Sequence, residues 1–126
     1  QDLGSDIARG RLYIPIADCA RHHVDPTELR RGVAGPGTRA LVAEMVAWSR
    51  ELMLRGAPLA RTVPGSAGWE LRLVVQGGLR ILEKIERGGC ATLERRPALH
   101  WYDVPLLLWR ALWMKAAAPP GLRKAA

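Results

Sequence analysis

The chain opens with Gln1-Asp2-Leu3-Gly4-Ser5-Asp6-Ile7-Ala8-Arg9-Gly10-Arg11-Leu12-Tyr13-Ile14-Pro15, the stretch that decides its fold and its class of function. If the start of this stretch is helical, the carboxylates of Asp2 and Asp6 lie on one face, one turn apart. Gly10 favours the end of that helix, because glycine readily adopts the left-handed conformation found there. Arg11 follows where the chain turns away. The stretch therefore predicts two carboxylates and a guanidinium near one short helix.

Two carboxylates with an arginine beyond them make a site for Mg²⁺ and a phosphate group. Magnesium prefers carboxylate and phosphate oxygens, and a guanidinium can bind further phosphate oxygens through two parallel hydrogen bonds. The spacing alone also fits a helix face that is merely solvated. Under that alternative the chain is a non-catalytic helical binding module, and Asp2 and Asp6 face solvent.

The wider pattern Gln-Asp-x-x-x-Asp-x-x-Arg-Gly-Arg-x-Tyr-x-Pro resembles the second aspartate-rich motif of the squalene/phytoene synthase family. That resemblance implies the all-α isoprenoid-synthase fold and a Mg²⁺-dependent reaction of prenyl diphosphates. By position in the motif, it implies that Asp2 and Asp6 bind the metal and that Arg11 helps to hold diphosphate. These three are the expected catalytic residues, and Gln1 and Tyr13 join Arg11 in the expected substrate site.

Two positions within the motif, residues 1–15, point to a subfamily. Most members have an arginine before the first aspartate and a glutamate before the second, where this chain has Gln1 and Ser5. The Gln-Asp-x-x-x-Asp form resembles the bacterial hydroxysqualene synthases of hopanoid biosynthesis. That resemblance implies conversion of presqualene diphosphate to hydroxysqualene with loss of diphosphate. Presqualene diphosphate synthase and phytoene synthase, which condense two prenyl diphosphates such as farnesyl diphosphate, remain open alternatives.

A second stretch supports the same family. Residues 77–86 read Gly-Gly-Leu-Arg-Ile-Leu-Glu-Lys-Ile-Glu and residues 93–97 read Leu-Glu-Arg-Arg-Pro, and together they resemble the family's C-terminal block. Two arginines in this block, Arg95 and Arg96, either contact diphosphate or are surface charges near a helix end.

The chain, at 126 residues, has the size of one domain with a modest core. The family's first aspartate-rich motif, which faces the second from another helix, is not present. We therefore expect residues 1–126 to be the C-terminal part of a longer synthase domain, inactive by itself, with a disordered tail over residues 119–126.

The net charge of +7 comes mainly from arginine, with 16 arginines against three lysines. No basic run is longer than two residues, so the sequence lacks the basic cluster typical of nucleic-acid-binding proteins. We expect no nucleic-acid partner. A basic chain also suits phosphate-rich lipid precursors and anionic membrane surfaces.

Cysteine and histidine usage argues against zinc. Cys19 and Cys90 are far apart without a Cys-x-x-Cys pair, and the adjacent His22 and His23 diverge on a helix. The expected cofactor is the Mg²⁺ that the family resemblance implies. Two free thiols fit a reducing compartment, so we expect a cytoplasmic protein, with peripheral contact to the inner face of the membrane left open. The longest apolar stretch, residues 104–118, contains basic residues and is too short to span a bilayer.

Apolar periodicity and helix breakers predict six helices and no sheet. The helices are expected over residues 2–9, 16–23, 26–32, 38–55, 67–87 and 103–117. Asp25, Thr38 and Asp103 are the expected N-caps. The helix that follows Asp25 is expected to be a surface connection.

Four apolar stripes are expected to face the core, because their residues recur at helical spacing. They are Ile16 and Ala20; Leu41, Met45, Trp48 and Leu52; Leu71, Val75, Gly78, Leu82 and Ile85; and Leu106, Trp109, Leu112 and Trp113. The glycines at 77–78 would let a neighbouring helix or a bound chain approach closely.

Two of these stripes leave alternatives open. Met45 and Trp48, with Met53, either pack between helices or line a tunnel for a prenyl chain. The last stripe, preceded by Trp101 and Tyr102, suits either a membrane surface or packing within the bundle.

Overall fold

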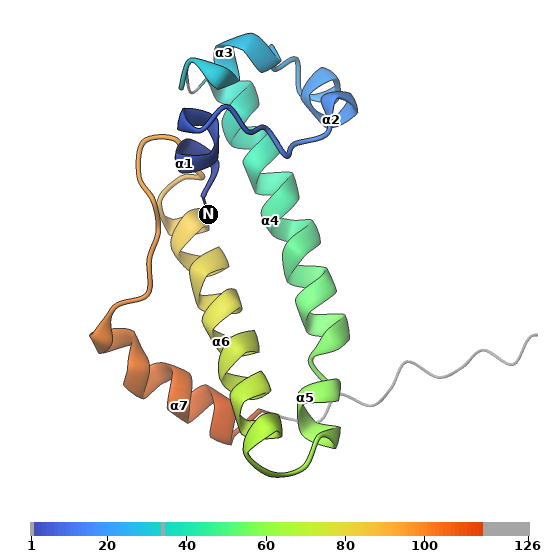
Figure 1. Cartoon of the computed structure of the whole chain (residues 1–126), viewed down its shortest axis with the longest axis vertical. Coiled ribbons are helices and arrows are strands. Elements are labelled where there is room, and N and C mark those ends of the chain that lie inside the picture. The colour runs from blue at the N-terminus through green and yellow to red at the C-terminus, as the bar shows by residue number, and fades with distance from the viewer. Residues whose placement is uncertain (1, 34, 115–126) are drawn as a thin grey trace, which may run out of the picture. The chain divides into compact units, whose positions relative to one another are not determined.

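The computed structural model describes residues 2–33 and 35–114 (Figure 1). These residues contain helices and no strand, so the predicted all-α fold class is confirmed. The helices are α1 (Leu3–Ala8), α2 (Ile16–Arg21), α3 (Pro26–Arg30), α4 (Pro36–Gly56), α5 (Leu59–Thr62), α6 (Gly65–Arg87) and α7 (Val104–Leu112), and a 3-10 turn, η1 (Trp101–Asp103), precedes α7. No helix among the described residues is long and apolar enough to cross a membrane. The expected tail, residues 119–126, lies outside the described residues.

The chain divides into two compact units. Unit 1 comprises Gln1–Ser49 and Ile81–Ala98, and unit 2 comprises Arg50–Arg80 and Leu99–Ala126. The helices α4 and α6 each contribute one part to either unit. Each unit has an apolar cluster of its own, so the two are described separately.

The core of unit 1 includes a helix that the sequence assigned to the surface. Its buried cluster consists of Ile14, Cys19, Val24, Leu29 and Leu41. The N-cap prediction for α3 is confirmed, because the Asp25 carboxylate accepts a hydrogen bond from the Thr27 backbone N–H at 2.8 Å. The prediction of a mere surface connection is wrong, because Leu29 of α3 is 0% exposed and packs in this cluster.

The face predicted for α2 is wrong. Ile16 is 73% exposed and Ala20 is exposed, whereas Cys19 is fully buried. The short helix has one inward position, Cys19, which packs in the apolar cluster of unit 1, and Arg21 forms an exposed ion pair with Glu44 of α4.

The face predicted for α4 is correct only in its first half. The helix begins at Pro36, which suits a first helical position, so Thr38 is a buried helical residue and not the expected cap. Its buried residues are Thr38, Leu41, Val42 and Val46. Trp48 and Leu52 are exposed, because the buried positions recur at 38, 42 and 46, along a row beside the predicted one.

The predictions for α6 hold best at its C-terminal half. Leu82 and Ile85 are buried, whereas Leu71 is 37% exposed. The close approach expected at Gly78 is confirmed, because a Cβ added there would lie 2.0 Å from the Met53 Cε. Met53 of α4 therefore packs against α6 within unit 2. The helix ends at Arg87, as predicted.

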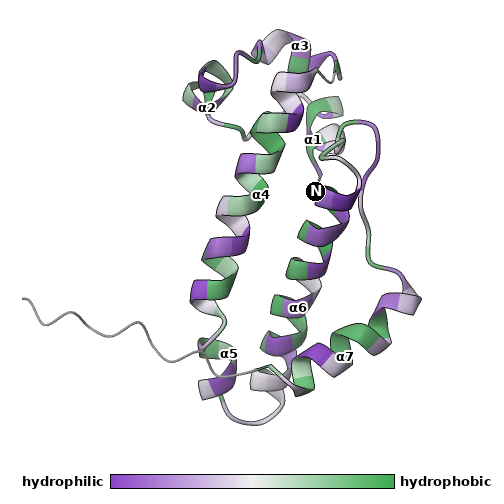
Figure 2. Ribbon diagram, turned by 180° about the vertical axis from the view of Figure 1, so that it is seen from behind, coloured by the Kyte–Doolittle hydropathy of each residue, from purple (hydrophilic) through white to green (hydrophobic). Residues whose placement is uncertain are grey.

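The predicted inward face of α7 is wrong. Asp103 is the N-cap residue of α7, as predicted, but its side chain makes no capping hydrogen bond to that helix. It is 1% exposed, and its carboxylate accepts hydrogen bonds from Arg80 Nε and the His100 backbone N–H, both at 2.9 Å. The buried residues that follow are Leu107, Ala111 and Met114. Trp109, Leu112 and Trp113, predicted to be inward, are exposed. Hydrophobic residues, drawn green, thus make up much of a helix whose outer face is apolar (Figure 2).

Both cysteines are free thiols, as predicted. Burial raises the pKa of Cys19, and the charge of Asp18 adds to this effect. Burial, followed by the charge of Glu86, likewise raises the pKa of Cys90. Neither thiol therefore has the lowered pKa that marks a reactive cysteine.

Candidate active site

Asp2 and Asp6 line the same cavity of unit 1, which has a volume of about 210 Å³. Asp2 is the N-cap residue of α1, and its carbonyl accepts a hydrogen bond from the Asp6 backbone N–H at 2.9 Å. This first helical turn brings the two side chains to one cavity, as the spacing predicted. The structure thus supplies the expected juxtaposition of two carboxylates, and their role in metal binding stays a prediction.

The end of α1 is as expected, but the arginine beyond it is not at the cavity. Gly10 adopts the left-handed conformation with φ +73°, and the Arg11 backbone N–H donates to the Asp6 carbonyl at 2.8 Å. The Arg11 side chain is exposed and is not among the described residues that line the cavity. Tyr13, of the expected substrate site, does line it, whereas Gln1 lies outside the described residues.

Arg96 is the basic residue that the structure brings to the carboxylates. Its Nη2 lies 2.7 Å from Asp2 Oδ1. From the sequence, Arg96 was either a diphosphate contact or a surface charge. The segment after α6 lies beside α1 (Figure 1). The two are close enough that a Cβ added to Gly4 would be 3.4 Å from the Leu93 carbonyl oxygen. The only signal for Arg96 in the sequence was its place in the Leu-Glu-Arg-Arg-Pro block.

The carboxylate oxygens of Asp2 and Asp6 match part of the ligand set of a magnesium ion. No group of three or more His, Cys, Asp or Glu residues within 2–33 and 35–114 could hold a metal ion. Mg²⁺ however binds commonly through one or two carboxylates and takes its remaining oxygens from water and substrate phosphate. Asp2 Oδ1 is shielded from solvent and forms an ion pair with Arg96, whereas the Asp2 side chain as a whole is 45% exposed. Asp2 and Asp6 therefore fit Mg²⁺ that is shared with a phosphate group.

The remainder of the cavity is mainly apolar. Val42, Met45 and Val46 of α4 and Leu82 and Ile85 of α6 form its walls. A volume of about 210 Å³ is smaller than the roughly 300–1,000 Å³ of typical ligand pockets. A long apolar ligand would therefore need space beyond this cavity.

Comparison with known proteins agrees with this chemistry. Residues 1–103 of the 126 match the squalene/phytoene synthase family. The chain belongs to that family. It is 35% identical over 121 residues to a phytoene synthase of Thermus thermophilus, a match that covers 95% of this chain and 41% of the relative. No solved structure matches the chain.

Membership of the squalene/phytoene synthase family confirms the resemblance that residues 1–15 suggested. The chain spans 41% of the length of the curated relative, so the activity of the whole protein is a matter for proposal. The prediction of the hydroxysqualene subfamily rested on Gln1 and Ser5. The family match does not distinguish among the reactions of the family's members. The curated relative is a phytoene synthase, and the hydroxysqualene reaction stays a prediction.

A second cavity of unit 1, of about 470 Å³, shares Tyr13 and Met45 with the first. Trp48 and Leu41 supply apolar surface there, and a polar network lies along its edge. Met45 and Trp48 thus line a cavity, whereas Met53 packs against α6, and the alternative of a tunnel for a prenyl chain stays a prediction.

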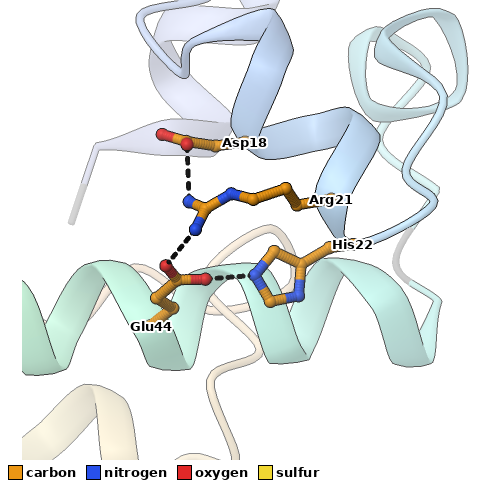
Figure 3. A network of polar contacts seen from close by, with 4 residues as sticks. All are labelled: Asp18, Arg21, His22 and Glu44. Atoms are coloured by element: carbon orange, nitrogen blue, oxygen red, sulfur yellow. Dashed lines mark hydrogen bonds and ion pairs between the residues drawn. The ribbon is translucent and has the colours of Figure 1, made fainter.

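The polar network holds α2 against α4 (Figure 3). The Arg21 guanidinium lies between two carboxylates, with Nη2 2.6 Å from Asp18 Oδ1 and Nη1 3.0 Å from Glu44 Oε1. His22 Nε2 donates to Glu44 Oε2. The hydrogen bond from His22, together with the charge of Arg21, holds the pKa of Glu44 below its usual value. The network thereby fixes the short connection that carries Tyr13 from α1 to α2.

Proposed function

We propose that the protein containing this chain is a Mg²⁺-dependent synthase that acts on prenyl diphosphates. The observation that carries the proposal is the pair Asp2 and Asp6 at one apolar cavity, with a guanidinium at Asp2. A cavity that joins carboxylates to apolar walls suits a substrate with a diphosphate head and a hydrocarbon chain. Membership of the squalene/phytoene synthase family supports the same class of substrate.

In this proposal acidic residues hold the metal, basic residues approach the diphosphate, and apolar residues form the walls around the hydrocarbon chain. Asp2 and Asp6 would hold Mg²⁺, which neutralises diphosphate as it leaves and so makes ionisation of the carbon–oxygen bond feasible. Arg96 lies beside Asp2, so its guanidinium would adjoin a diphosphate bound there. Arg11, exposed just beyond α1, would approach the same group from outside the cavity. The apolar walls would limit the access of water to the cation while it rearranges.

The reaction we propose first is the conversion of presqualene diphosphate to hydroxysqualene. The carbon–oxygen bond breaks, and diphosphate leaves with the bonding electrons. The resulting carbocation rearranges, and water adds to it and loses a proton, so no reductant is consumed. Gln1 and Ser5, which replace the residues usual in the family, support this choice.

The second candidate is condensation of two prenyl diphosphates to phytoene or presqualene diphosphate. The phytoene synthase of Thermus thermophilus, 35% identical over 121 residues, favours it. The same carboxylates would serve, because this reaction also begins with loss of diphosphate. The two candidates differ in the number of diphosphates consumed for each product.

The test is product analysis with the intact protein. Presqualene, farnesyl and geranylgeranyl diphosphates are supplied separately, with Mg²⁺ or with chelator, and released diphosphate and lipid products are identified. Hydroxysqualene from presqualene diphosphate supports the first candidate, and a condensed product supports the second. A protein that binds no prenyl diphosphate analogue in Mg²⁺ and forms no product would be the helical binding module.

A further inference from the structure

Two residues with aliphatic hydroxyls, Ser49 and Thr92, line the cavity of unit 1 that Asp2 and Asp6 also line. The other described residues around this cavity are apolar, except for Tyr13. A hydroxyl in an apolar wall costs free energy unless it forms a hydrogen bond, and water can be its partner. The positions of the two hydroxyls along the cavity decide which of them can hold a water molecule near the carboxylates.

Thr92 lies at the end of the cavity that carries the carboxylates. It belongs to a turn after α6, in which two backbone N–H groups donate to the Ala91 carbonyl at 3.0 and 3.1 Å. A Cβ added to Gly4, which lies in α1 between the two aspartates, would be 3.8 Å from the Thr92 carbonyl oxygen. Thr92 is 6% exposed. It is therefore a buried residue, held by a closed turn next to the helix of the carboxylates.

Ser49 lies toward the other end of the cavity. It follows Val46 by three residues on α4, along the face that lines the cavity. The turn after α6 contacts the start of α4, because Arg39 Nη2 lies 3.3 Å from Glu94 Oε1. Ten residues of helix, about 15 Å along its axis, lead from Arg39 to Ser49. The hydroxyls of Ser49 and Thr92 therefore belong to different parts of the cavity.

A water molecule is bound in a cavity only where it has several polar partners. Buried water typically makes about three hydrogen bonds, and a volume of about 210 Å³ is ample for one molecule. At Thr92 the hydroxyl adjoins the end where the carboxylates lie and where the proposed reaction places diphosphate oxygens. Ser49 has the apolar Met45 and Val46 as its nearest lining neighbours on α4. Tyr13 is 71% exposed and borders solvent. Thr92 is thus the hydroxyl best placed to hold an enclosed water.

We infer that Thr92 positions the water molecule that captures the carbocation, and that it thereby decides between an alcohol and a hydrocarbon as product. The inference rests on the proposed conversion of presqualene diphosphate to hydroxysqualene. The Thr92 hydroxyl accepts a hydrogen bond from the water and leaves a lone pair of the water oxygen free. That lone pair forms the new carbon–oxygen bond at the rearranged cation, and the proton passes to the released diphosphate. Thr92 is a positioning residue, because none of its own covalent bonds changes.

The other fate of the cation supplies the readout. Without a water held beside it, the cation loses a proton to the released diphosphate and becomes a hydrocarbon. Both fates follow the loss of diphosphate and consume no reductant. A residue that only positions water therefore changes the ratio of hydrocarbon to alcohol and leaves the rate of diphosphate release unchanged.

The experiment is product analysis of presqualene diphosphate turnover by the intact protein and three variants. Thr92→Val keeps the shape of the side chain but removes the hydroxyl, so the ratio of hydrocarbon to alcohol should rise about fivefold, as loss of one hydrogen bond predicts. Thr92→Ser keeps the hydroxyl and should return the ratio most of the way. Ser49→Ala is the matched control, because it removes the other aliphatic hydroxyl of the cavity, and it should leave the ratio unchanged.

A second measurement requires no turnover. Calorimetric titration of the substrate-free protein with Mg²⁺ should give the same affinity for Thr92→Val as for the unchanged protein, because the hydroxyl is not a metal ligand. An unchanged product ratio in Thr92→Val would overturn the inference. A lower Mg²⁺ affinity, or slower diphosphate release without a change of ratio, would also overturn it, because Thr92 would then act on the metal or on the fold. An unchanged protein that forms no hydroxysqualene would overturn the proposed reaction, and the inference with it, before any variant is made.

Discussion

Arg96 Nη2 lies 2.7 Å from Asp2 Oδ1, so a residue near the C-terminal end of unit 1 neutralises the first carboxylate of the candidate site. The two side chains are 63% and 45% exposed, and an ion pair this exposed contributes at most about 1 kcal/mol. A doubly charged cation at Asp2 would therefore displace the guanidinium at small cost. Arg96 is then left beside the metal, where a diphosphate would need it.

The first prediction concerns competition between Arg96 and Mg²⁺. In Arg96→Gln the Asp2 carboxylate is no longer paired, so the substrate-free intact protein should bind Mg²⁺ about two- to fivefold more tightly. Calorimetric titration with Mg²⁺ measures this change. Arg95→Gln is the matched control, because it removes the same charge from the neighbouring exposed position. An equal gain in both variants would show that net charge, and not the contact with Asp2, controls affinity.

A second prediction tests the core position of α3. Leu29 is 0% exposed, so Leu29→Ala should lower the free energy of unfolding by about 2–5 kcal/mol through lost packing and the cavity left behind. Val33→Ala, at a neighbouring position that is 52% exposed, should change it by no more than about 0.5 kcal/mol. Urea unfolding followed by circular dichroism measures both. Equal changes in the free energy of unfolding would mean that Leu29 of α3 does not belong to the core.

The sequence predicted where helices begin and end better than which way they face. Gly10 ends α1 and the glycines after Arg87 end α6, because these are local signals that glycine conformation explains. The carboxylates of Asp2 and Asp6 were likewise predictable, since one helical turn relates them.

Helix rotation depends on partners far away in the sequence. Cys19 of α2 packs against residues of α3 and α4, and Asp103 before α7 pairs with Arg80 of α6. No periodicity in either helix reveals such a partner. The contact of Arg96 with the site was invisible for the same reason, because it joins the two ends of unit 1.

A third prediction concerns acid stability. The hydrogen bond from His22 and the charge of Arg21 hold the pKa of Glu44 below its ordinary 4.5. The ionised carboxylate therefore stabilises the fold at neutral pH, and this contribution is lost as the pH falls from 4.5 through the lower pKa of the folded state. Glu44→Gln should melt at a lower temperature at pH 7, and the difference should shrink as the pH approaches that lower value.

The control for this comparison is Glu51→Gln on the same helix. Its partner Arg55 is 3.9 Å away, and both side chains are more than two-thirds exposed, so the melting temperature should barely change. A constant difference between Glu44→Gln and the unchanged protein from pH 7 to pH 3 would contradict the role given to the Glu44 carboxylate.

The fourth prediction tests the proposed metal site through Asp6. Asp6→Ala preserves α1, because alanine is the best helix former, but it removes one of the two carboxylates at the cavity. Turnover of the prenyl diphosphate by the intact protein should fall by about two or more orders of magnitude, since a lost ligand acts on ionisation itself. Asp2→Ala should behave alike. Ser5→Ala is the control, because Ser5 lies on α1 without lining the cavity.

The same assay tests Arg11, which belongs to the motif of residues 1–15 but does not line the cavity. Arg11→Lys keeps the charge but cannot make the two-pronged contact with a phosphate, so we expect a partial loss of turnover. The measurement is steady-state turnover across a Mg²⁺ titration, with circular dichroism to show that each variant is folded. Near-normal turnover in Asp6→Ala, together with a defect in Ser5→Ala, would mean that the carboxylates do not bind the metal. Asp2 and Asp6 would then be two acidic residues that share a cavity only because one helical turn places them there.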